Sequence, residues 1–68
     1  MTDFTKEINA APDEATHYVF DVDVYFSISS GTYYNKALNC WEITDFRTVE
    51  DLKQNYAKIL DLNNVKLL

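Results

Sequence analysis

The most regular feature of the sequence is an alternation of apolar and polar positions between residues 18 and 28. The even positions are all apolar or aromatic: Tyr18, Phe20, Val22, Val24, Phe26 and Ile28. The odd positions carry His17, Val19, Asp21, Asp23, Tyr25 and Ser27. Because successive side chains of a β-strand point to opposite faces, this period of two predicts one strand whose even face is buried.

A second strand is expected after a short turn at residues 29–31. Gly31 can adopt a positive φ there, and residues 32–43 then return beside the first strand, so that residues 17–43 form a hairpin. Apolar residues of both parities occur in the returning strand: Tyr33, Ala37, Trp41 and Ile43 on odd positions, Tyr34, Leu38 and Cys40 on even ones. This mixture indicates either a bulge that switches the phase or a strand that is covered on both faces.

The C-terminal part of the chain predicts a helix over residues 48–61. Thr48 is suited to the N-cap, and Asp51 stands in the capping-box position. Apolar residues then recur every three or four positions, at Val49, Leu52, Tyr56, Ile59 and Leu60. Asn63 and Asn64 can end this helix in the left-handed conformation, and residues 65–68 are expected to form a last short strand.

Residues 1–15 predict a short helix or arm. Thr2 or Asp3 can cap it, Phe4 and Ile8 stand one turn apart, and Pro12 ends it. The chain is therefore expected to be one small α+β domain in the order helix, strand, strand, helix, strand (αββαβ). One long helix covers one face of a three-stranded sheet, so the other face is expected to present aromatic residues and carboxylates to solvent or to a partner.

The composition argues against several classes of binding site. The 68 residues include 11 acidic and six basic side chains, a net charge of −5, and residues 1–23 hold six of the acids against Lys6 alone. Such a chain is not expected to bind nucleic acid directly, because nucleic-acid binding relies on Lys and Arg at the phosphates. With one Cys and one His, neither an intrachain disulfide nor a zinc set of the usual kind is expected, and no cofactor is implied.

The location expected from the sequence is the cytoplasm, or the host cytoplasm for a phage protein. No stretch approaches the roughly 18 apolar residues of a membrane span, and the first 15 residues lack the basic start and apolar run of a secretory signal. No contact with a membrane is expected.

His17 and Cys40 are the residues that a nucleophilic pair would need. The two strands of a hairpin can bring them near each other, but no third orienting group or oxyanion site accompanies them. No catalytic residue is therefore expected, and the pair is interpreted as a histidine at a strand end and a small buried thiol.

Asp21 and Asp23 would lie on one face of the first strand, about 6.6 Å apart. Two carboxylates alone make a poor site for Mg²⁺ or Ca²⁺, so no metal is expected. Either they are a solvated outward face, or their spacing imitates the phosphates of a nucleic-acid strand and binds the basic cleft of an enzyme. Tyr25 is expected to be exposed beside them, as an anchor for a protein interface.

The order of segments resembles a known family of phage proteins. The segments concerned are Tyr18–Ile28, Tyr33-Tyr34, Thr44-Asp45-Phe46 and Val65-Lys66-Leu67-Leu68. They are similar to the short acidic uracil-DNA glycosylase inhibitor of phi29-like Bacillus phages. The resemblance implies a homodimer that imitates DNA, occupies the DNA-binding groove of the enzyme and sequesters its inserted apolar side chain. It also implies that Glu42, Phe46 and Tyr56 contact the enzyme.

The leading hypothesis is a non-enzymatic inhibitor encoded by a phage or mobile element. Its target would be uracil-DNA glycosylase or a defence nuclease such as a CRISPR or restriction enzyme. The expected partner-binding residues are Asp21, Asp23, Tyr25, Glu42, Asp45, Phe46 and Tyr56. The alternative is a small dimeric interaction module whose target is unrelated to nucleic acids, and a third hypothesis, a small enzyme, would require His17 or Cys40.

Overall fold

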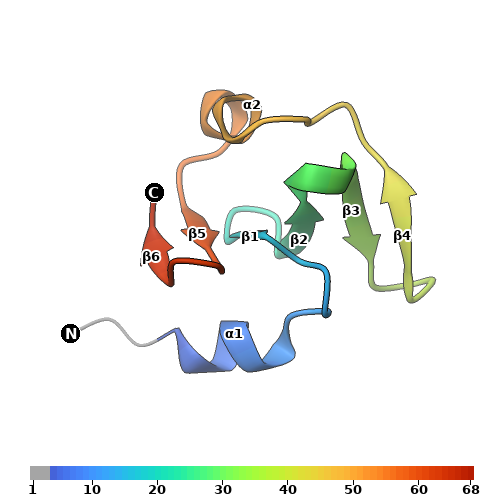
Figure 1. Ribbon diagram of the computed structural model, residues 1–68, viewed down its shortest axis with the longest axis horizontal. Helices are drawn as coiled ribbons and strands as arrows, with labels where there is room; N and C mark the ends of the chain where they lie inside the picture. The colour runs from blue at the N-terminus through green and yellow to red at the C-terminus, as the bar shows by residue number, and fades with distance from the viewer. Residues whose placement is uncertain (1–3) are drawn as a thin grey trace.

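The computed structural model describes residues 4–68 as a six-stranded antiparallel sheet with two α-helices (Figure 1). The elements in chain order are α1 (Thr5–Ala10), β1 (His17–Val19), β2 (Val24–Ser27), a 3-10 turn (Ile28–Ser30), β3 (Thr32–Asn35), β4 (Cys40–Ile43), α2 (Val49–Asn55), β5 (Ile59–Asp61) and β6 (Lys66–Leu67). The α+β class is confirmed. The caps expected at Thr2 or Asp3 lie outside the described residues. No helix within residues 4–68 has the length and apolar character needed to cross a membrane.

The sheet consists of three hairpins placed side by side. Strands β1 to β4 follow one another as a meander, and the segment containing α2 then carries the chain back so that β5 pairs with β1. The resulting order is β4-β3-β2-β1-β5-β6, with β4 and β6 at the two ends of the sheet (Figure 1). Gly31 adopts a left-handed conformation at the link between the first two hairpins.

All three hairpin turns share one geometry. Each has four residues between its paired strands, and the last of the four has a positive φ: 53° at Asp23, 54° at Asn39 and 51° at Val65. In the second turn, the Asn35 side-chain oxygen accepts the N–H groups of residues 37 and 38. In the third, Asp61 accepts those of residues 63 and 64. These side-chain oxygens fix the direction in which the chain enters the turn.

The continuous strand predicted over residues 18–28 is wrong, because the chain reverses at residues 20–23. Val19 pairs with Val24, and Tyr18 pairs with Tyr25, so parity inverts across the turn. Val19 and Tyr25, which the alternation placed on the outer face, are buried, whereas Val22 is 46% exposed. Both faces of the β1–β2 hairpin are buried, and a hairpin with two buried faces produces the same run of apolar residues as one long strand.

The predicted second strand is likewise a hairpin, β3 and β4. Its mixed parity is due neither to a bulge nor to a single strand covered on both sides. The four-residue turn at positions 36–39 changes parity between the two strands, so that Tyr33 pairs with Glu42 and Tyr34 with Trp41. The rings of Tyr34 and Trp41 meet edge to face at 5.3 Å between centroids.

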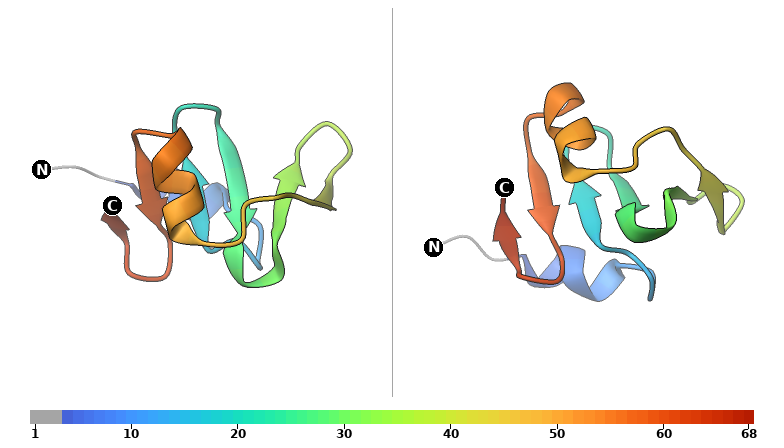
Figure 2. Two further views of the ribbon diagram at one scale, coloured as in Figure 1. Left: turned by 90° about the horizontal axis from the view of Figure 1, so that it is seen from above. Right: turned by 45° about the horizontal axis from the view of Figure 1, so that its top comes forward.

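Two hydrophobic clusters lie on opposite faces of the sheet. Figure 2 shows α1 and α2 on opposite sides of the sheet, one over each cluster. Leu52 of α2 packs with Val19, Phe26 and Ile59. Tyr18, Tyr25 and Leu60 form the other cluster, with Phe4, Phe20 and Tyr34 packed against them. The predicted uncovered face is therefore wrong for the central strands, because α1 lies over the cluster of Tyr18, Tyr25 and Leu60 (Figure 2), although Ile43 of β4 on the same side is 81% exposed.

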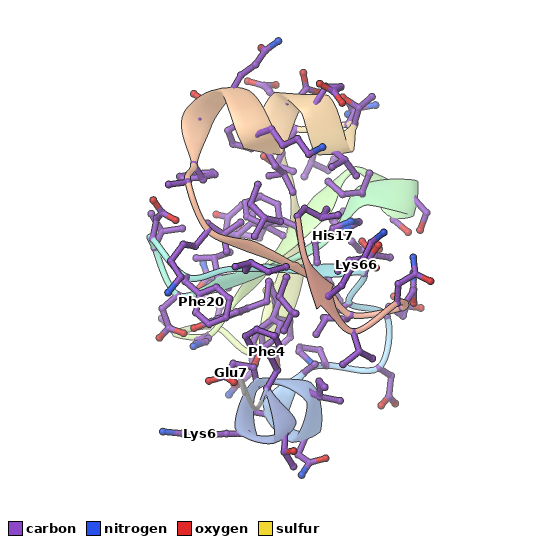
Figure 3. All side chains as sticks on the ribbon, turned by 90° about the vertical axis from the view of Figure 1, so that its left-hand side faces the viewer. Phe4, Lys6, Glu7, His17, Phe20 and Lys66 are labelled. Atoms are coloured by element: carbon purple, nitrogen blue, oxygen red, sulfur yellow. The ribbon has the colours of Figure 1, made fainter. Side chains whose placement is uncertain are left out.

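Aromatic contacts and a hydrogen bond from Tyr25 hold α1 to the sheet. The rings of Phe4 and Phe20 lie 6.0 Å apart, in the layer between α1 and the sheet (Figure 3). The Tyr25 hydroxyl donates to the Glu7 carbonyl at 2.8 Å. Tyr25 is only 5% exposed, so the prediction that it serves as an exposed anchor is wrong.

Helix α2 is shorter than predicted. The capping box of Thr48 and Asp51 is confirmed, with Asp51 N–H donating to Thr48 Oγ1 and the Asp51 carboxylate accepting Thr48 N–H. The helix ends at Asn55, because Tyr56 is extended and the Asp21 carboxylate accepts the next two backbone N–H groups. Residues 59–61 form β5 instead of a last helical turn. Asn63 and Asn64 lie in the β5–β6 turn, and the expected last strand is confirmed as β6.

The positive φ at Val65 gives a test of the turn geometry. A β-branched residue is strained in the left-handed region by about 1–2 kcal/mol, whereas asparagine is tolerated there. Val65 is 52% exposed, so Val65→Asn loses little packing, and we expect it to raise the free energy of unfolding by about 1 kcal/mol. The reverse change at the equivalent position, Asn39→Val, should lower it by a similar amount. Urea unfolding of both variants measures this, and a loss of stability in Val65→Asn would contradict the shared geometry.

Candidate functional site

An apolar groove of about 240 Å³ opens on the α2 side of the sheet. It is lined by Val22, Val24, Phe26, Tyr33, Thr44, Phe46 and Tyr56. The lining comes from the β1–β2 turn, from strands β2 and β3, and from the segments on either side of α2. The groove is therefore a consequence of the reversal at residues 20–23, which brings Val22 and Val24 beside the aromatic residues that flank α2.

Phe46 and Tyr56, both predicted to contact a partner, come together in this groove. Their ring centroids lie 5.8 Å apart, and Phe46 meets Phe26 edge to face at 5.6 Å. Thr44 Oγ1 accepts the Phe46 N–H, and the capping box begins two residues later at Thr48. The loop before α2 thus fixes Phe46, and the end of α2 fixes Tyr56.

Three predicted carboxylates belong to residues that adjoin the groove lining. Glu42 accepts hydrogen bonds from the Tyr33 hydroxyl at 3.1 Å and from Asn35 Nδ2 at 2.6 Å. These bonds hold the Glu42 carboxylate beside Tyr33, which lines the groove, and the bond to Glu42 raises the pKa of Tyr33. Asp45 is exposed between two lining residues, Thr44 and Phe46. Asp21 precedes Val22, another lining residue, in the β1–β2 turn.

Asp21 has a structural role as well. Its carboxylate accepts the N–H groups of Lys58 at 2.9 Å and of Ala57 at 3.2 Å, directly after the lining residue Tyr56. These backbone hydrogen bonds hold the pKa of Asp21 below its ordinary value, the bond from Lys58 contributing most. The carboxylate therefore joins the β1–β2 turn to the start of β5 and remains ionised at neutral pH.

Asp23 and Tyr25 belong to the opposite side of the sheet, so the structure does not bring all seven predicted residues together. The Asp23 carboxylate accepts the Tyr18 hydroxyl and pairs with Lys36 at 2.9 Å. These two bonds, that of Tyr18 first, lower the pKa of Asp23. Together with Tyr25, these residues line a second, polar cavity of about 410 Å³ beneath α1. The row of carboxylates predicted along one strand face is wrong, because Asp21 and Asp23 lie in a turn.

The structure separates His17 from Cys40. Strands β2 and β3 lie between β1 and β4, so the two residues are on the order of 14 Å apart across the sheet. Cys40 is exposed, not buried as expected. His17 is buried, Thr16 Oγ1 lies 2.8 Å from its Nδ1, and burial lowers its pKa. Within residues 4–68, no three Asp, Glu, His or Cys side chains are grouped to hold a metal ion.

Five lining residues are not among the predicted partner contacts: Val22, Val24, Phe26, Tyr33 and Thr44. The alternation places Val22 and Val24 on the buried face of one long strand, and nothing in their spacing shows that Val22 lies in a turn and Val24 begins the next strand. The sequence shows the Tyr33-Tyr34 pair, but the face on which each tyrosine lies depends on the β3–β4 turn.

Comparison with protein families, with curated proteins and with solved structures found no match to this chain. The resemblance to uracil-DNA glycosylase inhibitors therefore stays a prediction.

The hydrogen bonds of Asp21 predict a pH effect on stability. Because its pKa is lowered in the folded protein, the stabilisation is complete above the unfolded pKa of about 3.9 and is lost as the pH falls through the lower folded value. We expect Asp21→Asn to be less stable than the wild type at pH 7 and to lose less stability between about pH 4 and pH 2. Thermal unfolding across this range measures the effect.

Asp13→Asn, in the exposed segment before β1, is the control for the general loss of one negative charge. Equal acid sensitivity of Asp21→Asn and Asp13→Asn would show that Asp21 does not join the turn to β5.

Proposed function

We propose that this protein is a non-enzymatic inhibitor that occupies the basic nucleic-acid cleft of an enzyme. The groove receives one apolar side chain of the enzyme, and the carboxylates around it contact the basic residues of the cleft. One observation carries the proposal: each of Asp21, Glu42 and Asp45 is a sequence neighbour or a hydrogen-bond partner of a residue that lines the groove.

The orientation of nearby basic side chains supports this view. Arg47 follows Phe46, but its side chain lies against Gly31, and its Nε donates to the Thr44 carbonyl. Lys58 follows Tyr56 by two residues, and its Nζ lies 5.2 Å from the centroid of Phe20, which packs with the cluster beneath α1. Asp21, Glu42 and Asp45 nevertheless outnumber Arg47 and Lys58 next to the groove lining, and this excess of negative charge suits a basic partner.

The groove and the charges would make separable contributions to binding. Burying an apolar side chain of leucine size contributes about 1.5–3 kcal/mol and depends little on salt. Attraction between exposed charges is screened over about 8 Å at physiological ionic strength, so it affects mainly the rate of association and its salt dependence.

The alternative is an interaction module whose target has no connection with nucleic acids. The exposed apolar side chains of Val22, Leu38 and Ile43 favour it, because such positions suit association through apolar contact. A module of this kind would bind its partner with little dependence on salt, so the two functions give opposite results in one measurement.

Inhibition of a bacterial uracil-DNA glycosylase tests the proposal, with uracil excision from DNA as the readout and CRISPR and restriction nucleases as further targets. For the enzyme that is inhibited, we expect binding to weaken by about tenfold or more between low salt and about 0.5 M NaCl. Binding that is unchanged over this range would favour the interaction module. Inhibition of none of these enzymes would contradict the proposal.

Substitution in the groove gives a second test. We expect Phe46→Ala to weaken binding by about tenfold or more, because the inserted side chain loses one wall of its site. Leu67→Ala is the matched control: it truncates an exposed apolar side chain on β6, outside the groove. Circular dichroism shows whether each variant is folded. Equal affinity of a folded Phe46→Ala variant and the wild type would exclude the groove from the interface.

A further inference from the structure

The two edges of the sheet differ in how well they resist pairing with another chain. Natural proteins protect edge strands by making them short, by charging them or by bending them. The β6 edge has these features: it has two residues, Lys66 and Leu67, and follows the left-handed Val65. The β4 edge has four regular residues without lysine or proline. Figure 1 shows β4 at the end of the sheet.

The pairing of β4 with β3 shows which backbone groups face outward. Thr44 N–H donates to the Gly31 carbonyl, in register with the ladder between the two strands. In an antiparallel ladder, alternate residues direct both N–H and C=O to the same neighbour. Glu42 and Cys40 therefore pair toward β3, and Trp41 and Ile43 direct their backbone groups away from the sheet.

Side chains along this edge alternate in character. Ile43 is 81% exposed, and it lies on the same face as Trp41, on the α1 side of the sheet. The other face carries Glu42, the one charged residue of the strand, whose carboxylate accepts the hydroxyl of the groove residue Tyr33. An added strand would therefore meet apolar side chains on one face and a carboxylate on the other.

We propose that β4 accepts an extended segment of the partner protein as a seventh strand, and that apolar and basic residues alternate in this segment. Its apolar residues would lie beside Trp41 and Ile43, and its basic residue beside Glu42. A second copy of this chain fits the edge less well. Symmetric antiparallel pairing would bring Glu42 opposite Cys40 or opposite its own copy, and two chains of net charge −5 repel each other. The inference rests on the proposed function, because the basic residues of the segment follow from the basic cleft that is proposed for the partner.

A synthetic peptide in which valine and lysine alternate (VKVKVKV) tests the edge alone. Nuclear magnetic resonance follows the backbone amides of the protein during titration. We expect saturable shifts and slowed hydrogen exchange centred on the amides of Trp41 and Ile43, because these groups gain hydrogen-bond partners. A peptide in which valine and glutamate alternate should bind about tenfold more weakly or not at all. Equal binding of both peptides would overturn the proposed occupant.

Proline substitution separates the edge from the rest of the sheet. Ile43→Pro removes an outward N–H without removing a bond to β3, and we expect it to weaken peptide binding by about tenfold or more. The control is Leu67→Pro at the opposite edge, where Leu68 N–H donates to the Ile59 carbonyl and the Leu67 N–H therefore faces outward. If the proline variant does not fold, Ile43→Lys replaces it in the test. This variant keeps the N–H but adds a positive charge that repels the lysines of the peptide, so it should also weaken binding.

Phe46→Ala distinguishes this inference from the proposed groove. It should bind the peptide as well as the wild type does, even where it no longer inhibits an enzyme. Peptide-induced shifts confined to the groove residues would contradict the edge proposal. So would protection of Trp41 and Ile43 that rises with protein concentration in the absence of peptide, because this would identify a second copy as the occupant.

Discussion

The reversal of the chain at residues 20–23, ending in the left-handed Asp23, is the constraint on which the rest of the structure depends. It sets Val19 opposite Val24 and Tyr18 opposite Tyr25, and so divides the apolar residues of one continuous run between two faces of the sheet. Each face then needs its own cover, which α1 and α2 provide. Asp21, in the same turn, holds the backbone that leads into β5, so the turn also determines where the chain returns to the sheet.

Some elements could be predicted because their signals are local. The Thr48–Asp51 capping box starts α2 as expected, and residues 65–68 contain the last strand. The first reversal could not be predicted from parity, because Tyr18 and Phe26 are both buried and both even-numbered, yet they lie on opposite faces. The end of α2 was missed for a related reason: the apolar spacing continues through Ile59, but long-range pairing with β1 and the bonds to Asp21 place that residue in a strand.

The candidate site, like the fold, could be predicted from the sequence only in part. Phe46 and Tyr56 were expected at an interface and line one groove, with Glu42, Asp45 and Asp21 around it. Tyr25 and Asp23 were expected there too, but the reversal places them beneath α1, where Tyr25 is buried and Asp23 pairs with Lys36. Of the two carboxylates that the sequence suggests as an imitation of phosphates, only Asp21 lies next to the groove lining, together with Glu42 and Asp45, whereas Asp23 lies on the other side of the sheet. This arrangement suits a basic protein surface with one protruding apolar side chain.

The groove, the two cores and the outward groups of β4 all require the three-hairpin pairing, so the cross-strand register is the measurement that tests the account most directly. Nuclear Overhauser effects in a labelled sample report it. Three-hairpin pairing predicts contacts that link Tyr18 with both Tyr25 and Leu60, because β1 lies between β2 and β5. A single long hairpin over residues 17–43 would instead bring Tyr18 beside Glu42, and contacts between these two residues without those to Tyr25 would contradict the account.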